Sequence, residues 1–294
     1  MPRVSYTAPT SIDDAVKALA ASAGLAKVLS GGTDLLVQMK SGRTRPELIV
    51  DTKHIPGLVG IREQGDQFVI GAATPGVMIS ADERLIRAYP GIVEGVDLIG
   101  STQIQGRASI AGNLCNASPA ADSVPPVIAA RAKAVVAGPN GRREVPVESI
   151  VTGPGQTSLQ KGEFVVEFRV PKPKPRQSDA YLRFIPRNEM DIAVVGVGAS
   201  VTLDLNDDRI TQARVALGAV GPTPIFAREA SQALAGKRIN DEAIERAAQL
   251  ATTASSPIDD MRGTAEFRRH VTGVLTRRSL AKAIERARTG PTSR

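Results

Sequence analysis

A stretch almost free of large side chains, ASIAGNLCNASPAAD at residues 108–122, constrains this chain most strongly. Such a stretch contributes little to a hydrophobic core, but its bare main chain can approach another group closely. Within it, the backbone amides of Ser109–Asn113 (SIAGN) can form a concave nest for an anion. We therefore expect this stretch to line a binding site.

A second turn of small residues, Ser30–Asp34 (SGGTD), lies between an apolar run at residues 26–29 and a helix expected over residues 34–40. A turn between a strand and a helix can direct free N–H groups and the helix dipole at an anion. Taken alone, a Gly-Gly turn is more often structural than ligand-binding. Together with the nest at Ser109–Asn113, however, it predicts a clamp for a ligand with two phosphates, such as a dinucleotide.

Two other glycine stretches fit nucleotide motifs less well. Gly196–Ser200 (GVGAS) lacks the third glycine of the dinucleotide fingerprint and is followed by strand-like residues, so we expect a closely packed strand. Gly153–Ser158 (GPGQTS) has no lysine in the phosphate-loop position and predicts a plain loop.

The pattern along the first half of the chain predicts two units. A helix capped by Thr10 and Asp13, with strands at residues 26–29 and 48–50, makes residues 1–57 a small βαβ unit. Residues 58–175 alternate short strands with Gly and Pro, which predicts an antiparallel sheet. Helices are expected in this second unit over residues 81–88 and 118–131.

A proline-rich segment, residues 171–178 (PKPKPRQS), is the best linker, because alternating proline keeps the backbone extended. After it we expect a third unit, residues 178–290, with two long strands joined at residues 206–208 and helices from Pro224 onward. The pattern as a whole predicts an α+β protein.

Composition limits the function. The single cysteine, Cys115, cannot form an internal disulfide or by itself hold an iron–sulfur cluster or structural zinc. Metal redox chemistry must therefore lie in another chain. No stretch reaches the length of a membrane span and the first residues resemble no signal peptide, so we expect a cytoplasmic protein.

The net charge of +7 is concentrated at the end of the chain, because residues 261–294 hold nine Arg or Lys residues against Glu266 and Glu285. No aromatic residues are interleaved with these charges as in a single-strand nucleic-acid platform. A solvated basic helix, or a surface for an acidic partner subunit, is favoured over nucleic-acid binding.

Five motifs, taken in order, resemble a known family: KVLSGGTDLLVQMK, IGAAT, IGSTQIQGRASIAGNLCNASPAADSVPP, RNEMDIAVVGVGASVTLD and PIDDMRGTAEFRRHV. The chain resembles, over nearly its whole length, the FAD-binding (medium) subunit or flavin domain of the xanthine dehydrogenase and carbon monoxide dehydrogenase family of molybdenum hydroxylases. The resemblance implies a two-subdomain FAD-binding domain of the PCMH/VAO type. A C-terminal domain with a small antiparallel sheet and a helical bundle is expected to follow.

The resemblance also implies which residues surround the FAD. The first flavin loop would be Val28, Leu29, Ser30, Gly31, Gly32, Thr33, Asp34 and Leu35; the second would be Ser109, Ile110, Ala111, Gly112 and Asn113. Ile99, Asp122, Val165, Arg183 and Ile192 would lie near the ring or ribityl chain, with Arg183 as the candidate cation. Ile192 and Val165 fit simple strand core equally well.

Two positions depart from relatives. Ala111 replaces a family glycine, and we expect it to keep an ordinary φ and retain FAD binding. Ile192 stands where carbon monoxide dehydrogenases tend to carry Tyr, so this position favours a subunit of the xanthine dehydrogenase type over one of the carbon monoxide dehydrogenase type.

The implied activity is that of an oxidoreductase subunit with non-covalent FAD and no general acid or base of its own. A large subunit would hold the molybdenum cofactor, a small subunit would hold two [2Fe–2S] clusters, and the assembly would be a dimer of heterotrimers. Electrons would leave to an external acceptor. Two alternatives remain: a self-contained flavin oxidase or reductase of the same broad fold, and a non-catalytic binding protein that uses its basic tail. In the first alternative, a covalent flavin would commonly use His, but His54 and His270 lie outside the motifs.

Overall fold

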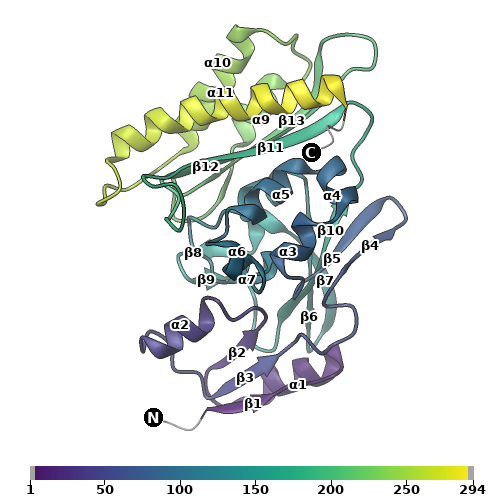
Figure 1. Cartoon of the computed structure of the whole chain (residues 1–294), viewed down its shortest axis with the longest axis vertical. Helices are drawn as coiled ribbons and strands as arrows, with labels where there is room; N and C mark the ends of the chain where they lie inside the picture. Colours follow the sequence, from purple (N-terminus) through teal and green to yellow (C-terminus); the bar gives the residue numbers. More distant parts are fainter. Residues whose placement is uncertain (1–3, 291–294) are drawn as a thin grey trace.

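The computed structural model describes residues 4–290, which form three units stacked along the long axis of the molecule (Figure 1). The first unit is a parallel three-stranded sheet of order β1-β3-β2 with two helices. Its elements are β1 (Ser5–Thr7), α1 (Ile12–Ala21), β2 (Ala26–Leu29), α2 (Leu35–Lys40) and β3 (Leu48–Asp51). The predicted βαβ unit is confirmed, with β1 as an additional strand.

Helix α1 begins one residue later than the sequence suggested. Its N-cap is Ser11, whose Oγ accepts a hydrogen bond from the backbone N–H of Asp14 at 3.1 Å. The predicted cap at Thr10 and Asp13 is therefore wrong by one position. The helix buries Val16 and Leu19 in a cluster that includes Phe164 of the second unit, so the first two units share a core.

The second unit is built on an antiparallel five-stranded sheet of order β4-β5-β10-β6-β7, as predicted. The strands are β4 (Ile61–Gln64), β5 (Gln67–Gly71), β6 (Lys133–Gly138), β7 (Gly141–Pro146) and β10 (Phe164–Pro171). The helices are α3 (Gly76–Ser80), α4 (Glu83–Ala88), α5 (Pro90–Asp97), α6 (Thr102–Gln105), α7 (Ile110–Cys115) and α8 (Val124–Ala129), with a 3-10 turn at Val147–Ser149. Most of its core lies between the sheet and these helices.

Two expectations for this unit need correction. The helix predicted over residues 118–131 forms only as α8, because Pro125 and Pro126 lack a backbone N–H and are tolerated only in a first helical turn. The predicted loop at Gly153–Ser158 is part of a hairpin of β8 (Val151–Gly153) and β9 (Gln156–Thr157).

The third unit is an antiparallel four-stranded sheet of order β11-β12-β13-β14 packed against helices. Its elements are β11 (Gln177–Phe184), β12 (Val195–Leu203), β13 (Ile210–Gly218), β14 (Ile225–Phe226), α9 (Arg228–Leu234), α10 (Asp241–Ala254) and α11 (Ala265–Thr289). Helix α11 runs across this sheet (Figure 1). The two predicted long strands are confirmed, but Ile225 and Phe226 pair with β13 and precede the first helix.

The GVGAS stretch lies in β12, as expected for a strand with close backbone packing. A Cβ placed on Gly198 would lie 2.8 Å from the backbone of Pro125. Glycine at this position therefore lets the third unit pack directly on α8 of the second.

Many of the basic residues of α11 bind acids within the chain. Arg277 binds Glu245 at 2.9 Å, while Lys282 and Arg286 bind Glu94 of α5 at 2.7 and 2.6 Å. The ion pairs at Glu94 join α11 to the second unit, so part of the predicted basic face is used internally.

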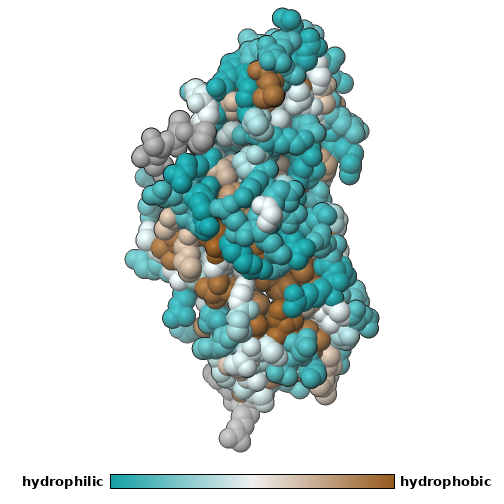
Figure 2. Space-filling view, turned by 90° about the vertical axis from the view of Figure 1, so that its right-hand side faces the viewer, coloured by the Kyte–Doolittle hydropathy of each residue, from teal (hydrophilic) through white to brown (hydrophobic). Residues whose placement is uncertain are grey.

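Within residues 4–290, no helix combines the length and the apolar character that a membrane crossing requires. The face in Figure 2 is largely hydrophilic, and its hydrophobic residues form separate patches, most of them in the lower half.

Candidate functional site

The two side-chain-poor turns meet in space. The hydroxyl oxygens of Ser30 and Ser109 lie 2.9 Å apart and share a hydrogen bond. A Cβ placed on Gly31 would lie only 1.9 Å from the carbonyl oxygen of Arg107, so the main chains of the two turns are in direct contact. Residues nearly 80 positions apart in the sequence thus form one continuous surface.

Local interactions hold the first turn in place. Gly32 has φ +79, a left-handed conformation that glycine adopts without strain. Lys53 donates from Nζ to the carbonyl oxygen of Ser30 at 3.0 Å and to Asp51 Oδ1 at 2.6 Å. The turn is therefore anchored to the residues that follow β3.

The second turn begins helix α7. Ser109 caps the helix, because its Oγ accepts a hydrogen bond from the N–H of Gly112 at 3.1 Å. A further bond joins the two turns from their far ends: Gln38 Nε2 of α2 donates to Asn116 Oδ1 at 2.7 Å.

A cavity of about 560 Å³ opens against both turns, within the range of small-molecule and cofactor sites. The candidate residues in its wall are Val28, Ser30, Gly31, Gly32, Thr33, Asp34, Leu35, Ile99, Ser109, Ala111, Gly112, Asn113 and Val165. Five further candidates are not part of this wall: Leu29, Ile110, Asp122, Arg183 and Ile192.

The substitution in the second loop is accommodated by helical backbone. Ala111 lies inside α7 and is not among the residues with positive φ. The expectation of an ordinary φ at this position is confirmed, so alanine causes no backbone strain here.

The wall also contains residues that the sequence did not suggest. The segment 159–164, which connects β9 to β10, closes one side of the cavity, and residues 23–27 at the start of β2 extend it. Gln38 and Asn116 complete the junction between the turns. Only the three-dimensional fold brings the segment 159–164 to the turns, because no local motif marks it.

Charged and reactive groups in the wall are few. Burial raises the pKa of Asp34 above its ordinary value. Burial also raises the pKa of the Cys115 thiol to about 12, against the opposing charge of Lys27. The thiol therefore stays protonated near neutral pH and is a poor nucleophile.

Arg183, the candidate cation, binds another protein group. Its Nη1 lies 2.7 Å from Asp122 Oδ2, and both side chains are almost completely buried. In this structure Arg183 is part of a buried ion pair with Asp122, and neither residue is in the cavity wall.

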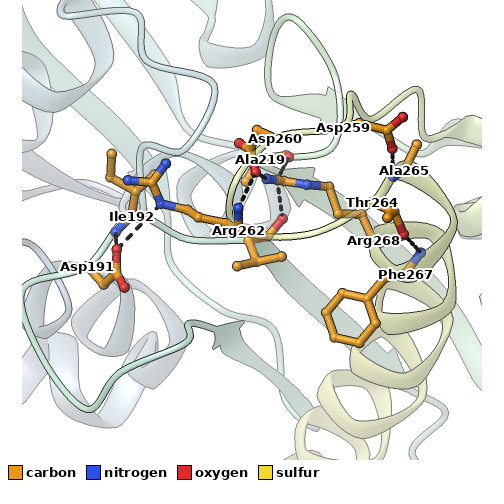
Figure 3. Close-up of polar contacts among 11 residues, drawn as sticks. Asp191, Ile192, Ala219, Asp259, Asp260, Arg262, Thr264, Ala265, Phe267 and Arg268 are labelled. Carbon is orange, nitrogen blue, oxygen red and sulfur yellow. Dashed lines mark hydrogen bonds and ion pairs between the residues drawn. The ribbon is translucent and has the colours of Figure 1, made fainter.

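Ile192 lies in the loop between β11 and β12, where the residue is 52% exposed. The alternative that Ile192 is simple strand core is therefore wrong, whereas Val165 is both buried in β10 and part of the cavity wall. Figure 3 shows how the loop is held: Asp191 accepts from the N–H of Ile192 at 2.8 Å and from Arg262 Nε at 3.5 Å.

A buried arginine fixes the segments around this loop (Figure 3). Arg268 donates to the carbonyl oxygens of Val194 and Ala219 at 2.9 and 3.2 Å, and to Asp260 Oδ1 at 2.6 Å. The turn before α11 and the end of the Ile192 loop therefore share one guanidinium group.

Among residues 4–290, no cluster of three or more His, Cys, Asp or Glu side chains is placed to hold a metal ion. Both histidines, His54 and His270, are exposed and lie outside the cavity wall.

Comparisons with known proteins agree with this architecture. Residues 2–173 match the family model described as the FAD binding domain in molybdopterin dehydrogenase, and residues 180–283 match the CO dehydrogenase flavoprotein C-terminal domain. The carbon monoxide dehydrogenase medium chain of Hydrogenophaga pseudoflava is 34% identical, over 97% of this chain and 98% of the relative. The xanthine dehydrogenase FAD-binding subunit of Escherichia coli O157:H7 is 32% identical, over 96% and 97%.

A solved structure gives the same result. One chain of the Hydrogenophaga pseudoflava carbon monoxide dehydrogenase that lacks the Mo-pyranopterin moiety of its cofactor superimposes with a TM-score of 0.92, at 34% identity, over 97% of this chain and 98% of that chain. The protein therefore belongs to the family of FAD-binding medium subunits of the xanthine dehydrogenase and carbon monoxide dehydrogenase type, and is an oxidoreductase flavoprotein subunit.

Proposed function

We propose that this chain binds one FAD without a covalent bond and serves as the electron-transfer subunit of a heterotrimeric molybdenum hydroxylase. A small partner subunit with [2Fe–2S] clusters would supply the electrons, and an external acceptor would take them. The molybdenum cofactor would be held by a large partner subunit. The relatives that carry this assignment are medium chains and FAD-binding subunits of dehydrogenases.

The observation that carries the proposal is the contact between the two turns beside a cavity. The backbone N–H groups of residues 31–35 find no hydrogen-bond acceptor among residues 4–290, and those of Ile110 and Ala111 likewise find none. Free amides on adjoining turns are the donors that a diphosphate requires. The residues present therefore fit the diphosphate bridge of FAD.

The rest of the wall suits the other parts of the cofactor. Ile99 and Val165 offer apolar surface that can pack against a ring and exclude water. Neither histidine lies in the wall and the Cys115 thiol is protonated near neutral pH, which supports non-covalent attachment. Bound FAD supplies reversible one- and two-electron chemistry. The chain contributes binding, orientation and shielding.

A glycine in the wall provides the test. Apart from the backbone of its own helix, the atom of residues 4–290 that a Cβ on Gly112 would meet within 4 Å is Ser109 Oγ, at 3.3 Å. Gly112→Val therefore adds bulk at a residue of the cavity wall and requires only a small shift of the Ser109 side chain. We expect FAD affinity to fall about tenfold or more, equivalent to a loss of about 1.4 kcal/mol. The measurement is FAD bound per chain, from the absorption spectrum after gel filtration, together with a titration.

Gly106→Val is the matched control, because a Cβ there also has its nearest neighbour at 3.3 Å but Gly106 is not in the wall. Equal FAD affinity in both variants would contradict the assigned site.

Purification of the wild-type chain tests the assembly, because the proposal expects a large and a small partner subunit to purify with it. A flavoprotein that turns over a small substrate with no partner chain would favour the self-contained oxidase instead.

A further inference from the structure

A buried polar cluster joins the third unit to the second behind the cavity. Asp122, in the loop before α8, accepts hydrogen bonds from the Tyr181 hydroxyl at 2.7 Å and from Arg183 Nη1 at 2.7 Å. Tyr181 and Arg183 both belong to β11. Asp122 and Tyr181 are 7% and 2% exposed, so the cluster is shielded from water.

One arm of the cluster reaches the cavity through Arg183. Its Nη1 also donates to the carbonyl oxygen of Leu98 at 2.8 Å, and the next residue, Ile99, lies in the cavity wall. The backbone that presents Ile99 to the cavity is thus held by a guanidinium group from a different unit.

A second arm reaches the cavity through Ser123, which follows Asp122. The N–H and hydroxyl of Ser123 donate to Asn113 Oδ1 at 3.2 and 2.7 Å, and Asn113 belongs to the second turn of the cavity wall. Asp122 is therefore linked to two separate parts of the wall while lying outside it.

The pKa of Asp122 depends on the hydrogen bonds that its carboxylate accepts. Burial raises the pKa of Asp122 to about 6, although Arg183 and Tyr181 both act to lower it. These are the charged or titratable groups that face Asp122 among residues 4–290. Removing one donor leaves a buried carboxylate less stabilised, which weakens the whole arrangement.

We propose that Tyr181 is a positioning residue for the flavin site: with Asp122 and Arg183, it lets strand β11 set the places of Ile99 and Asn113 in the cavity. Tyr181 acts indirectly, through its hydrogen bond to Asp122, because its own side chain is not in the cavity wall. The inference rests on the proposed function, since it concerns how the FAD site is shaped.

The test compares two buried tyrosine hydroxyls in the full chain, purified as it assembles. Tyr181→Phe removes the bond to Asp122, whereas Tyr89→Phe removes a similar bond from Tyr89 to the carbonyl oxygen of Pro171 at 2.6 Å. Tyr89 is 1% exposed and is not in the cavity wall, so it controls for the loss of a buried hydroxyl. We expect about a fivefold weaker FAD affinity for Tyr181→Phe only, as for loss of one net hydrogen bond, with an altered visible circular dichroism of the flavin.

A pH series gives a readout that a purely structural role would not move. FAD affinity is expected to fall as Asp122 takes up a proton, with a midpoint near its raised pKa of about 6. Tyr181→Phe removes a group that lowers this pKa, so its midpoint moves to higher pH. Asp34 in the wall, whose pKa is also raised, is unchanged in Tyr181→Phe and in Tyr89→Phe.

The outcomes separate the two proposals. A wild-type chain that takes up no FAD overturns the proposed function and this inference with it. A wild-type chain that binds FAD, with Tyr181→Phe matching Tyr89→Phe in affinity, flavin spectrum and pH midpoint, overturns this inference alone. Because Tyr181→Phe keeps the ring and the Asp122–Arg183 pair, it is expected to fold where Asp122→Ala would leave Arg183 buried without a counter-ion.

Discussion

At the scale of single residues, the site depends on positions where the main chain comes closer than a side chain would allow. Gly31 touches the carbonyl oxygen of Arg107, and Gly32 adopts a left-handed φ. The sequence showed these positions clearly, because paired glycines between a strand and a helix are a local signal. The wall residues between 159 and 164 carried no such signal, since their role depends on a contact made across the fold.

Ala111 supports a prediction at this scale. Because its φ is ordinary and it lies within α7, replacing it with glycine should not improve FAD binding. Ala111→Gly should instead lower the free energy of unfolding by about 0.5–1 kcal/mol, the usual cost of glycine inside a helix. Denaturant unfolding and an FAD titration check this. A gain in FAD affinity of several fold would mean that the backbone at Ala111 is strained after all.

At the scale of helices and strands, the sequence predicted the long strands of the third unit more accurately than the helices of the second. The long strands β12 and β13 were predicted from their extended apolar runs and are confirmed. The helix over residues 118–131 was overestimated, because the two prolines fix its start at Val124. The Pro-initiated helix α5 was missed, although Pro90 at its first position is a recognisable start signal.

The contact between β11 and α5 predicts an unusual dependence of stability on pH. Asp179 Oδ1 accepts from the N–H of Gly91 at 2.9 Å, while Oδ2 is buried and finds no hydrogen-bond donor among residues 4–290. Burial raises the pKa of Asp179 to about 7, assisted by Glu94 and opposed by the backbone of Gly91 and by Arg286. In the unfolded chain the carboxyl has its ordinary, lower pKa, so between the two values the folded state binds more protons.

The free energy of unfolding should therefore fall as pH rises toward 7, by at most about 1.4 kcal/mol per pH unit for this group. Asp179→Asn cannot ionise and should flatten the upper part of this slope, from about pH 6 to about pH 7. Below that range Asp122, with its raised pKa of about 6, contributes in the same direction in both proteins. Denaturant unfolding across this pH range decides the matter, and equal slopes for both proteins would show that Asp179 is already ionised throughout.

At the scale of the whole molecule, the cavity is made where separate units meet. Its wall combines residues of the βαβ unit with the second turn and with the segment before β10. Strand β11 of the third unit supports this wall, because Arg183 donates to the carbonyl oxygen of Leu98 beside Ile99. Sequence motifs identified both turns and the family. They placed Arg183 and Ile192 near the cofactor, and those placements remain predictions, since neither side chain is in the cavity wall.

The most direct test of the central claim is an experimental structure of this chain with FAD bound. We expect the diphosphate between the two turns, within hydrogen-bond distance of backbone N–H groups of residues 31–35 and of Ile110 and Ala111, with the ring system beside Ile99 and Val165. Density for FAD elsewhere on the molecule, or turns that separate with no nucleotide between them at saturating FAD, would contradict it.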